Sequence, residues 1–199
     1  MIRHPHYLRY DRNFQYDLAL VMLPDRYVLP MASRSKMRPE QTYEPPNPPK
    51  DDSPLPLHLA SLPEDYAYTK RMILQLGLGY KSGNYIEEND PVTIHKATYE
   101  VVENKACKAA VPRIDVKTTM CIIGKKGEYT TLGDSGGPYV AKRKNGQTFL
   151  IGVNSGGTNY QVTYSTGINR EWNFTHGTRI SSVRRWMERL VGKSLETKP

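Results

Sequence analysis

The apolar positions of this chain fall in short runs that are rich in β-branched residues and separated by turn residues. Runs of this length and spacing predict the strands of an antiparallel β-barrel or sandwich. Lys144-Asn145-Gly146 lies between two runs and is a strong hairpin signal, because Asn-Gly favours the tight turns that join antiparallel strands. The expected strands lie within Pro91 to Val101, Thr118 to Ile123, Pro138 to Ala141, Phe149 to Val153, and Val162 to Ser165.

The C-terminal segment has a different period. From Ser181 to Val191 the apolar residues recur at helical spacing, and Gly192 follows as a stop signal. Three of the remaining positions are basic, Arg184, Arg185 and Arg189, which would also suit a surface-binding helix. We expect a terminal amphipathic helix that docks on the core and exposes its basic face to solvent.

A proline-rich stretch interrupts the pattern between residues 39 and 56. Seven of its eighteen residues are proline, which fixes φ and removes backbone donors. The stretch therefore cannot form a helix or a central strand, and it predicts an exposed, polyproline-like connector. The alternative is a docking ligand for a partner groove.

Gly133-Asp134-Ser135-Gly136-Gly137-Pro138 is the stretch with the clearest chemistry. Glycines on both sides let the backbone bend sharply and let a substrate carbonyl approach the serine, and the neighbouring N–H groups can form an oxyanion pocket. A serine among glycines is often only a loop, so the spacing by itself leaves both interpretations open.

The complete six-residue string resembles the active-site signature of the trypsin/chymotrypsin serine proteases. The resemblance covers nearly the whole chain outside the proline-rich insert. It implies an all-β, chymotrypsin-like double antiparallel β-barrel in which the first barrel is incomplete, with a C-terminal α-helix. Residues 1–38 would then be the remnant of the first barrel, 39–56 the linker, 57–192 the second barrel with its helix, and 193–199 a tail.

The resemblance also implies roles for individual residues. Ser135 matches the nucleophile, and the N–H groups of Gly133 and Ser135 would form the oxyanion hole. Asp17, which follows the His4-Pro5-His6-Tyr7 string, matches the carboxylate that orients the catalytic imidazole. Asp134 matches the residue of the activation pocket, which becomes ordered when a new N-terminus inserts beside it.

Four further residues match substrate-binding positions. Tyr129 falls at the pocket floor, where trypsins carry Asp, and Thr175 falls on a wall where Gly is usual. Ser155 and Gly157 match the strand that pairs with the substrate backbone, although Gly156 stands in place of an aromatic residue. We expect the added bulk to shrink or fill the pocket, so cleavage after Arg or Lys is not expected.

The chain has two cysteines, Cys107 and Cys121, and their spacing alone is compatible with free thiols or with a disulfide. The resemblance implies a disulfide, which in turn implies an oxidising, extracellular setting. The sequence shows no signal peptide that would support secretion. Asn173 begins an N-glycosylation sequon, which would mark an exposed loop if it is used.

The catalytic histidine of the family has no counterpart here. In the family it lies upstream of the aspartate in an Ala-Ala-His-Cys context, and no histidine of this chain precedes a cysteine. We expect a secreted binding or regulatory homologue that is non-catalytic as this chain. The alternative is a fragment of an active secreted endopeptidase whose signal, activation site and histidine lie upstream. The five histidines are His4, His6, His58, His95 and His176.

The net charge of +8 favours acidic partners, and an anionic polysaccharide is one such candidate. The basic residues are scattered and are not interleaved with aromatics, so we expect no nucleic-acid partner. No apolar run is long enough to span a membrane. The expected partners are a protein or peptide substrate, or a partner protease, and no cofactor or metal is expected. Unpaired strand edges around residues 17–23 predict that residues 70–192 form the better-folded unit.

Overall fold

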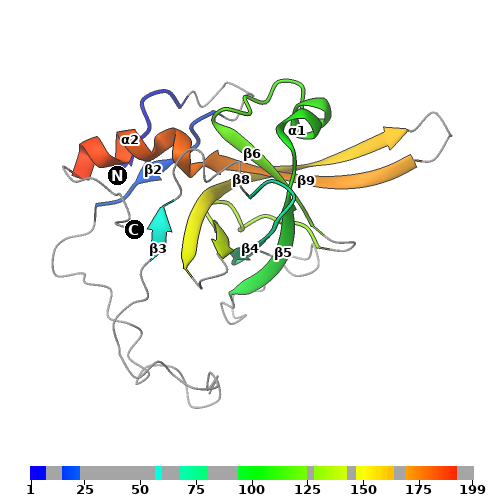
Figure 1. The fold of residues 1–199 in the computed structure, drawn as a ribbon, viewed down its shortest axis with the longest axis horizontal. Helices are drawn as coiled ribbons and strands as arrows, with labels where there is room; N and C mark the ends of the chain where they lie inside the picture. Colours follow the sequence, from blue (N-terminus) through cyan, green and yellow to red (C-terminus); the bar gives the residue numbers. More distant parts are fainter. Residues whose placement is uncertain are drawn as a thin grey trace, which may run out of the picture.

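The structure of the chain is a computed structural model. The described residues are 1–7, 15–22, 57–59, 68–79, 94–124, 128–142, 147–163 and 169–191, without the side chains of 57, 58, 158–163 and 169–173. Figure 1 shows their arrangement. In chain order the elements are β1 (Ile2–Arg3), β2 (Ala19–Leu20), β3 (Leu57–Leu59), β4 (Met72–Gly77), β5 (His95–Val101), α1 (Asn104–Ala110), β6 (Thr119–Gly124), β7 (Pro138–Lys142), β8 (Thr148–Thr163), β9 (Asn169–Arg179) and α2 (Ile180–Val191).

Six strands form a closed antiparallel barrel. Their order is β8, β7, β4, β5, β6 and β9, and β9 pairs back with β8 to close the ring. Strand β3 lies outside this ring and pairs in parallel with the first residues of β8. Closure leaves the six ring strands without a free edge along their paired lengths.

The expected strands correspond to β5, β6, β7 and β8, since each predicted run overlaps one of these elements. The Lys144-Asn145-Gly146 turn itself lies outside the described residues, but the strands on either side of it, β7 and β8, pair antiparallel. The sequence gave no signal for α1, a short helix that begins after Val101. The expected terminal helix is present as α2.

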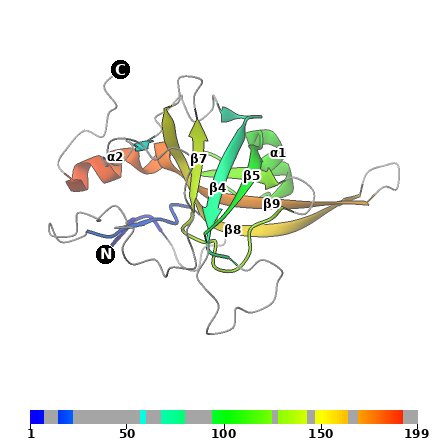
Figure 2. The same cartoon turned by 90° about the horizontal axis from the view of Figure 1, so that it is seen from below.

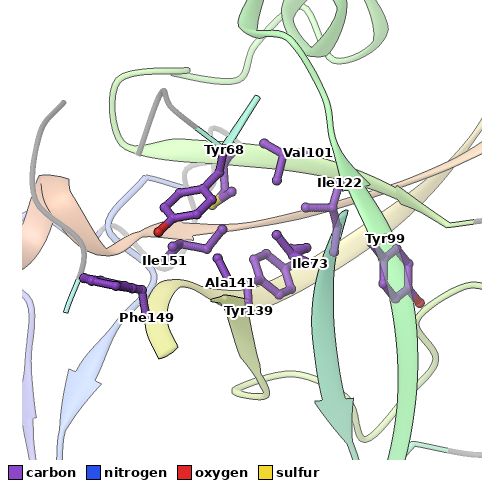
Figure 3. Close-up of a cluster of buried hydrophobic side chains, with 10 residues drawn as sticks. Tyr68, Ile73, Tyr99, Val101, Ile122, Tyr139, Ala141, Phe149 and Ile151 are labelled. Atoms are coloured by element: carbon purple, nitrogen blue, oxygen red, sulfur yellow. The ribbon is translucent and has the colours of Figure 1, made fainter. Parts of the chain in front are cut away.

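The barrel interior is filled by side chains from its own strands and by Tyr68, which lies just before β4 (Figure 3). Burying a large apolar side chain contributes about 1.5–3 kcal/mol relative to leaving it exposed, so this cluster is the main stabilising element of the ring. The buried residues of the cluster are Tyr68, Ile73, Tyr99, Val101, Met120, Ile122, Tyr139, Ala141, Phe149 and Ile151.

Helix α2 packs the N-terminal segment against the barrel. Its buried residues Ile180, Val183, Trp186 and Met187 contact Leu18 and Leu20 of that segment, and also Leu150 and Val153 of β8. Figures 1 and 2 both show α2 beside the β1–β2 sheet, at the opposite side of the barrel from the far end of β8 and β9. The N-terminal segment is therefore fixed next to β8, the strand that carries Ser155.

Candidate active site

The Ser135 turn lies in the connection that leads from β6 into β7. Gly133 has a φ of +97° and Gly136 a φ of +85°, which are left-handed values that favour glycine. Asp134 N donates to Thr131 O at 3.1 Å, and Gly137 N donates to Asp134 O at 3.0 Å, which closes two consecutive turns. Ser135 is exposed at the bend.

The polar groups of this turn that would serve catalysis are unengaged. Within the described residues, the N–H groups of Gly133 and Ser135 donate no hydrogen bond, and Ser135 Oγ makes none either. Two adjacent backbone donors of this kind can accept a carbonyl or oxyanion from a ligand. The turn is thus formed without using the groups that a substrate would need.

A buried asparagine, Asn154, holds the Ser135 turn by hydrogen bonds. Asn154 of β8 is 3% exposed, and its Nδ2 donates to the carbonyl of Asp134 at 2.9 Å. Its backbone exchanges two hydrogen bonds with the turn, from Gly136 N and to Gly137 O, each at 2.8 Å. Tyr139 Oη donates to Asn154 Oδ1 at 2.8 Å. Sequence reasoning missed both Asn154 and Tyr139, although a polar residue in an apolar strand was the available signal.

Asp17 lies against β8 as well. Ser155 Oγ donates to Asp17 Oδ2 at 2.5 Å, and Thr178 Oγ1 donates to the Asp17 carbonyl at 2.9 Å. The preceding residue, Tyr16, has a φ of +53°, a backbone conformation that is uncommon for an aromatic residue and is found where surrounding contacts impose it. The structure thus brings Asp17 and Ser155 together, one residue along β8 from the asparagine that holds the Ser135 turn.

Two buried histidines lie near these groups. His4 stacks on Tyr16 with ring centroids 4.4 Å apart and meets Trp186 edge-on at 4.7 Å, so it packs under the residue that precedes Asp17. Burial lowers the pKa of His4, and the charges of His6 and Arg189 lower it further. His4 therefore has a structural role, because its imidazole packs between Tyr16 and Trp186.

His176 of β9 pairs across from Gly156 and is 2% exposed. Burial lowers its pKa to about 4, although the Asp17 carboxylate opposes that shift. His176 does not line the cavity that contains Ser135. Among the described residues, no histidine accepts a hydrogen bond from Ser135 Oγ.

A cavity of about 240 Å³ opens beside Ser135. Its described walls come from β8, β9 and the segment before Ser135, and none of these described lining residues is a carboxylate or a cation. Thr130 Oγ1 and Thr175 Oγ1 lie 2.9 Å apart and hydrogen-bond across it. The lining residues are Tyr129, Thr130, Thr131, Leu132, Ser135, Asn154, Gly156, Gly157, Phe174 and Thr175.

Tyr129 and Thr175 were expected to reduce this pocket. Thr175 is buried in its wall, but Tyr129 is 49% exposed. Both residues line the cavity, and their expected effect on its size stays a prediction. None of the described lining residues is a carboxylate that could pair with an arginine or lysine side chain, and the expected lack of tryptic specificity also stays a prediction.

A second cavity of about 230 Å³ lies behind the turn and contains Asp134. Asp134 Oδ1 accepts a hydrogen bond from Gly79 N at 2.9 Å, and Oδ2 accepts one from Thr131 N at 2.8 Å. A Cβ on Gly79 would overlap the Asp134 carboxylate, which explains the glycine there. The structure therefore places Asp134 in an enclosed, hydrogen-bonded setting.

This second cavity also contains two polar groups that sequence reasoning did not identify. Tyr99 Oη and Glu128 Oε2 are buried there, and neither has a hydrogen-bond partner in the described part of the chain. Burial raises the pKa of Tyr99, and the negative charges of Asp134 and Glu128 raise it further. Two carboxylates, Asp134 and Glu128, thus line this cavity together with Lys96 and His95.

Cys107 and Cys121 form a disulfide, with Cα atoms 5.7 Å apart. The bond ties α1 to β6 and lies in a separate apolar cluster with Ala110, Ile114 and Phe174. The side chain of Asn173, the sequon residue, lies outside the described residues. Across the described ranges, neither helix is both long enough and apolar enough to cross a membrane.

A closed barrel with the Gly-Asp-Ser-Gly-Gly turn before β7, and an aspartate brought to it from a separate small sheet, defines the chymotrypsin-like class of serine protease folds. The family model described as Trypsin matches residues 1–186, and the chain therefore belongs to the trypsin family. The expected all-β fold class is confirmed. In the described residues the first barrel is represented by the β1–β2 sheet, and the second barrel by the closed ring.

Proposed function

We propose that this chain binds an extended peptide segment at the Ser135 cavity, and that it does so as an extracellular, non-catalytic member of the trypsin family. The segment would belong to a protein substrate or to a partner protease. The observation that carries the proposal is the Ser135 turn beside an open cavity. Among the described residues, its two N–H groups donate no hydrogen bond and Ser135 Oγ has no base in hydrogen-bonding contact.

Peptide binding at this site would use backbone and cavity together. The N–H groups of Gly133 and Ser135 would receive one ligand carbonyl, and the β8 backbone at Ser155 to Gly157 would pair with the preceding residues of the peptide. The uncharged cavity, with Phe174 and the two hydrogen-bonded threonines, suits a neutral side chain of moderate size. The disulfide supports an extracellular setting.

The non-catalytic part of the proposal rests on the missing base. A serine hydroxyl is a weak nucleophile at neutral pH unless an adjacent base takes its proton. In a well-studied protease, loss of the histidine lowers turnover on the order of 10⁶-fold. His176 is a poor substitute because it is buried and is not among the residues that line the Ser135 cavity.

The test compares hydrolysis and binding in one preparation. Cleavage of peptide p-nitroanilides by the chain should equal that of a Ser135→Ala variant, because no base assists the hydroxyl. NMR titration with acetylated Ala-Ala-Pro-X amides should show tighter binding when X is leucine or phenylalanine than when X is arginine or aspartate. Hydrolysis that depends on Ser135 would overturn the non-catalytic part, and failure of every peptide to bind would overturn the whole proposal.

The alternative function is that of an active secreted endopeptidase of which this chain is a part. The hydrogen bond between Ser155 and Asp17 favours it, since a carboxylate held in this way is what a catalytic imidazole requires. Labelling with a fluorophosphonate separates the two. Rapid, Ser135-dependent labelling of a longer version of the chain, with none for the chain itself, would support the endopeptidase. If the fluorophosphonate labels neither the chain nor the longer version, the result would support the proposed binding protein.

A further inference from the structure

The peptide bond between Asp134 and Ser135 is held through its carbonyl, which accepts hydrogen bonds from the side chain of Asn154 and from Gly137 N. We propose that Asn154 is a positioning residue that orients the Ser135 N–H toward the ligand, with Tyr139 holding Asn154 in turn. The inference rests on the proposed use of the Ser135 turn as a carbonyl-binding site.

Peptide planarity carries the first step. In a trans peptide the C=O of Asp134 and the N–H of Ser135 point in opposite directions within one plane. The Asp134 carbonyl accepts hydrogen bonds from Asn154 Nδ2 at 2.9 Å and from Gly137 N at 3.0 Å. These two bonds hold the carbonyl toward β8, so the Ser135 N–H is held on the opposite side, where it makes no bond within the described residues.

The chemistry of the amide fixes which way Asn154 faces. A carbonyl oxygen accepts only, so the group that meets Asp134 O must be the Nδ2 donor. That leaves Oδ1 facing Tyr139, whose hydroxyl donates to it at 2.8 Å. Tyr139 is 0% exposed and burial raises its pKa well above the usual value, so this hydroxyl keeps its proton. Asn154 and Tyr139 therefore have one arrangement in which both polar atoms of the amide are hydrogen-bonded.

Burial makes this arrangement hard to leave. Asn154 is 3% exposed, so rotation of the Asp134–Ser135 peptide would strand its Nδ2 without a partner in the interior. The same rotation would break the bond from Gly137 N. Asn154 therefore favours the binding-competent turn before any ligand arrives, a form of preorganisation. Gly133 contributes the other N–H and makes no contact with Asn154, so the effect is confined to the Ser135 donor.

The test isolates the part of the affinity that depends on the ligand carbonyl. The probes are an acetylated Ala-Ala-Pro-Leu-Ala amide and its (E)-alkene isostere at the Leu-Ala bond, which keeps the shape but lacks the carbonyl. The variants are Asn154→Asp, which removes the Nδ2 donor at nearly constant volume, and Tyr139→Phe. Thr118→Val is the matched control, since Thr118 is buried and bonds to Asp115 instead of the turn.

For the unmodified chain we expect the carbonyl peptide to bind about two- to tenfold more tightly than the isostere, the range of one net hydrogen bond. In Asn154→Asp this ratio should fall toward one while the affinity for the isostere is unchanged. Tyr139→Phe should lower the ratio less, and Thr118→Val should leave it alone. Equal weakening of both ligands, or an unchanged ratio in Asn154→Asp, would overturn the inference.

A second readout separates this inference from the proposed function. Amide exchange of Gly137, which donates to the same carbonyl, should accelerate about tenfold or more in Asn154→Asp, while exchange of the β5 amides is unchanged. If the unmodified chain binds neither peptide, the proposed function fails, and this exchange result still decides whether Asn154 positions the turn. If Asn154→Asp does not fold, Tyr139→Phe answers both questions.

Discussion

The two halves of the candidate site are held by different parts of the molecule and by different forces. The Ser135 half lies in the closed ring, over a core of large buried side chains. Three hydrogen bonds connect its turn to Asn154, and a fourth connects Asn154 to Tyr139. The Asp17 half belongs to a two-stranded sheet with exposed Val21 and Met22. It reaches the barrel through α2 packing and a few side-chain hydrogen bonds. A site built in this way can retain one half while the other opens.

The largest expected effect comes from the barrel core. Phe149→Ala removes a side chain that is 1% exposed, and such truncations destabilise a fold by about 3–5 kcal/mol. Because the ring supports both halves, urea unfolding followed by near-ultraviolet circular dichroism should show the loss in one transition. Two separated transitions would instead show that the N-terminal segment is stable without the ring.

The disulfide provides the next test. Replacing Cys107 and Cys121 together with alanine removes a crosslink over a sequence separation of 14, for which chain entropy gives about 3 kcal/mol. The loss should appear in the thermal midpoint of the barrel. The bond is remote from α2, so amide exchange in residues 15–22 should change no more than the global stability does.

The folded chain should lose stability in acid because the imidazole of His176 is buried. His176 has a pKa of about 4 in the folded chain and an ordinary value near 6.5 when unfolded. The unfolded state thus binds the proton first, so this stabilisation is complete above pH 6.5 and is lost as pH falls toward 4. The loss amounts to on the order of 3 kcal/mol. His176→Asn should flatten this part of the stability profile measured by urea titration, and an unchanged slope would contradict the assignment.

The smallest expected effect should be confined to the N-terminal segment. Ser155→Ala removes the hydrogen bond to Asp17, worth about 1–2 kcal/mol for a half-buried charged acceptor. Exchange of amides in residues 15–22 should accelerate, while the ring is unaffected. Ser182→Ala is the matched control, because Ser182 donates to Arg179 O at 2.7 Å and does not touch Asp17. Equal acceleration in both variants would show that the effect is general loosening of α2.

Sequence patterns predicted β5, β6 and β7 because strand alternation and turn residues are local signals. They split β8 into two separate runs, and β9 was not among the expected strands. They missed α1, a helix of seven residues that is too short to show a helical period. For Tyr129, which was expected to help shrink or fill the pocket, the structure gives a half-exposed side chain among the residues that line the cavity, and the expectation stays a prediction. Tyr129 lies in an irregular segment before Ser135, where no repeat fixes the side on which a residue lies.

Contacts between distant residues were beyond the reach of any local pattern. The family resemblance supplied Asp17 and Ser155 separately, yet their hydrogen bond joins positions 138 residues apart. Tyr99 and Glu128 share a cavity with Asp134 only because the ring folds β5 behind the Ser135 turn. Asn154 and Tyr139 come from neighbouring strands of a hairpin, and their roles depend on which face of β7 and β8 is buried.

The long β8–β9 ribbon has a practical consequence. The pairs from Gly152 with Arg179 to Gly157 with Thr175 already close the ring, and further pairs continue outward as far as Thr163 with Asn169 (Figure 1). The outer β8–β9 residue pairs are therefore not needed to close the barrel. A foreign peptide or a fluorescent label could be grafted there as a handle for capture or imaging, leaving the barrel as its carrier.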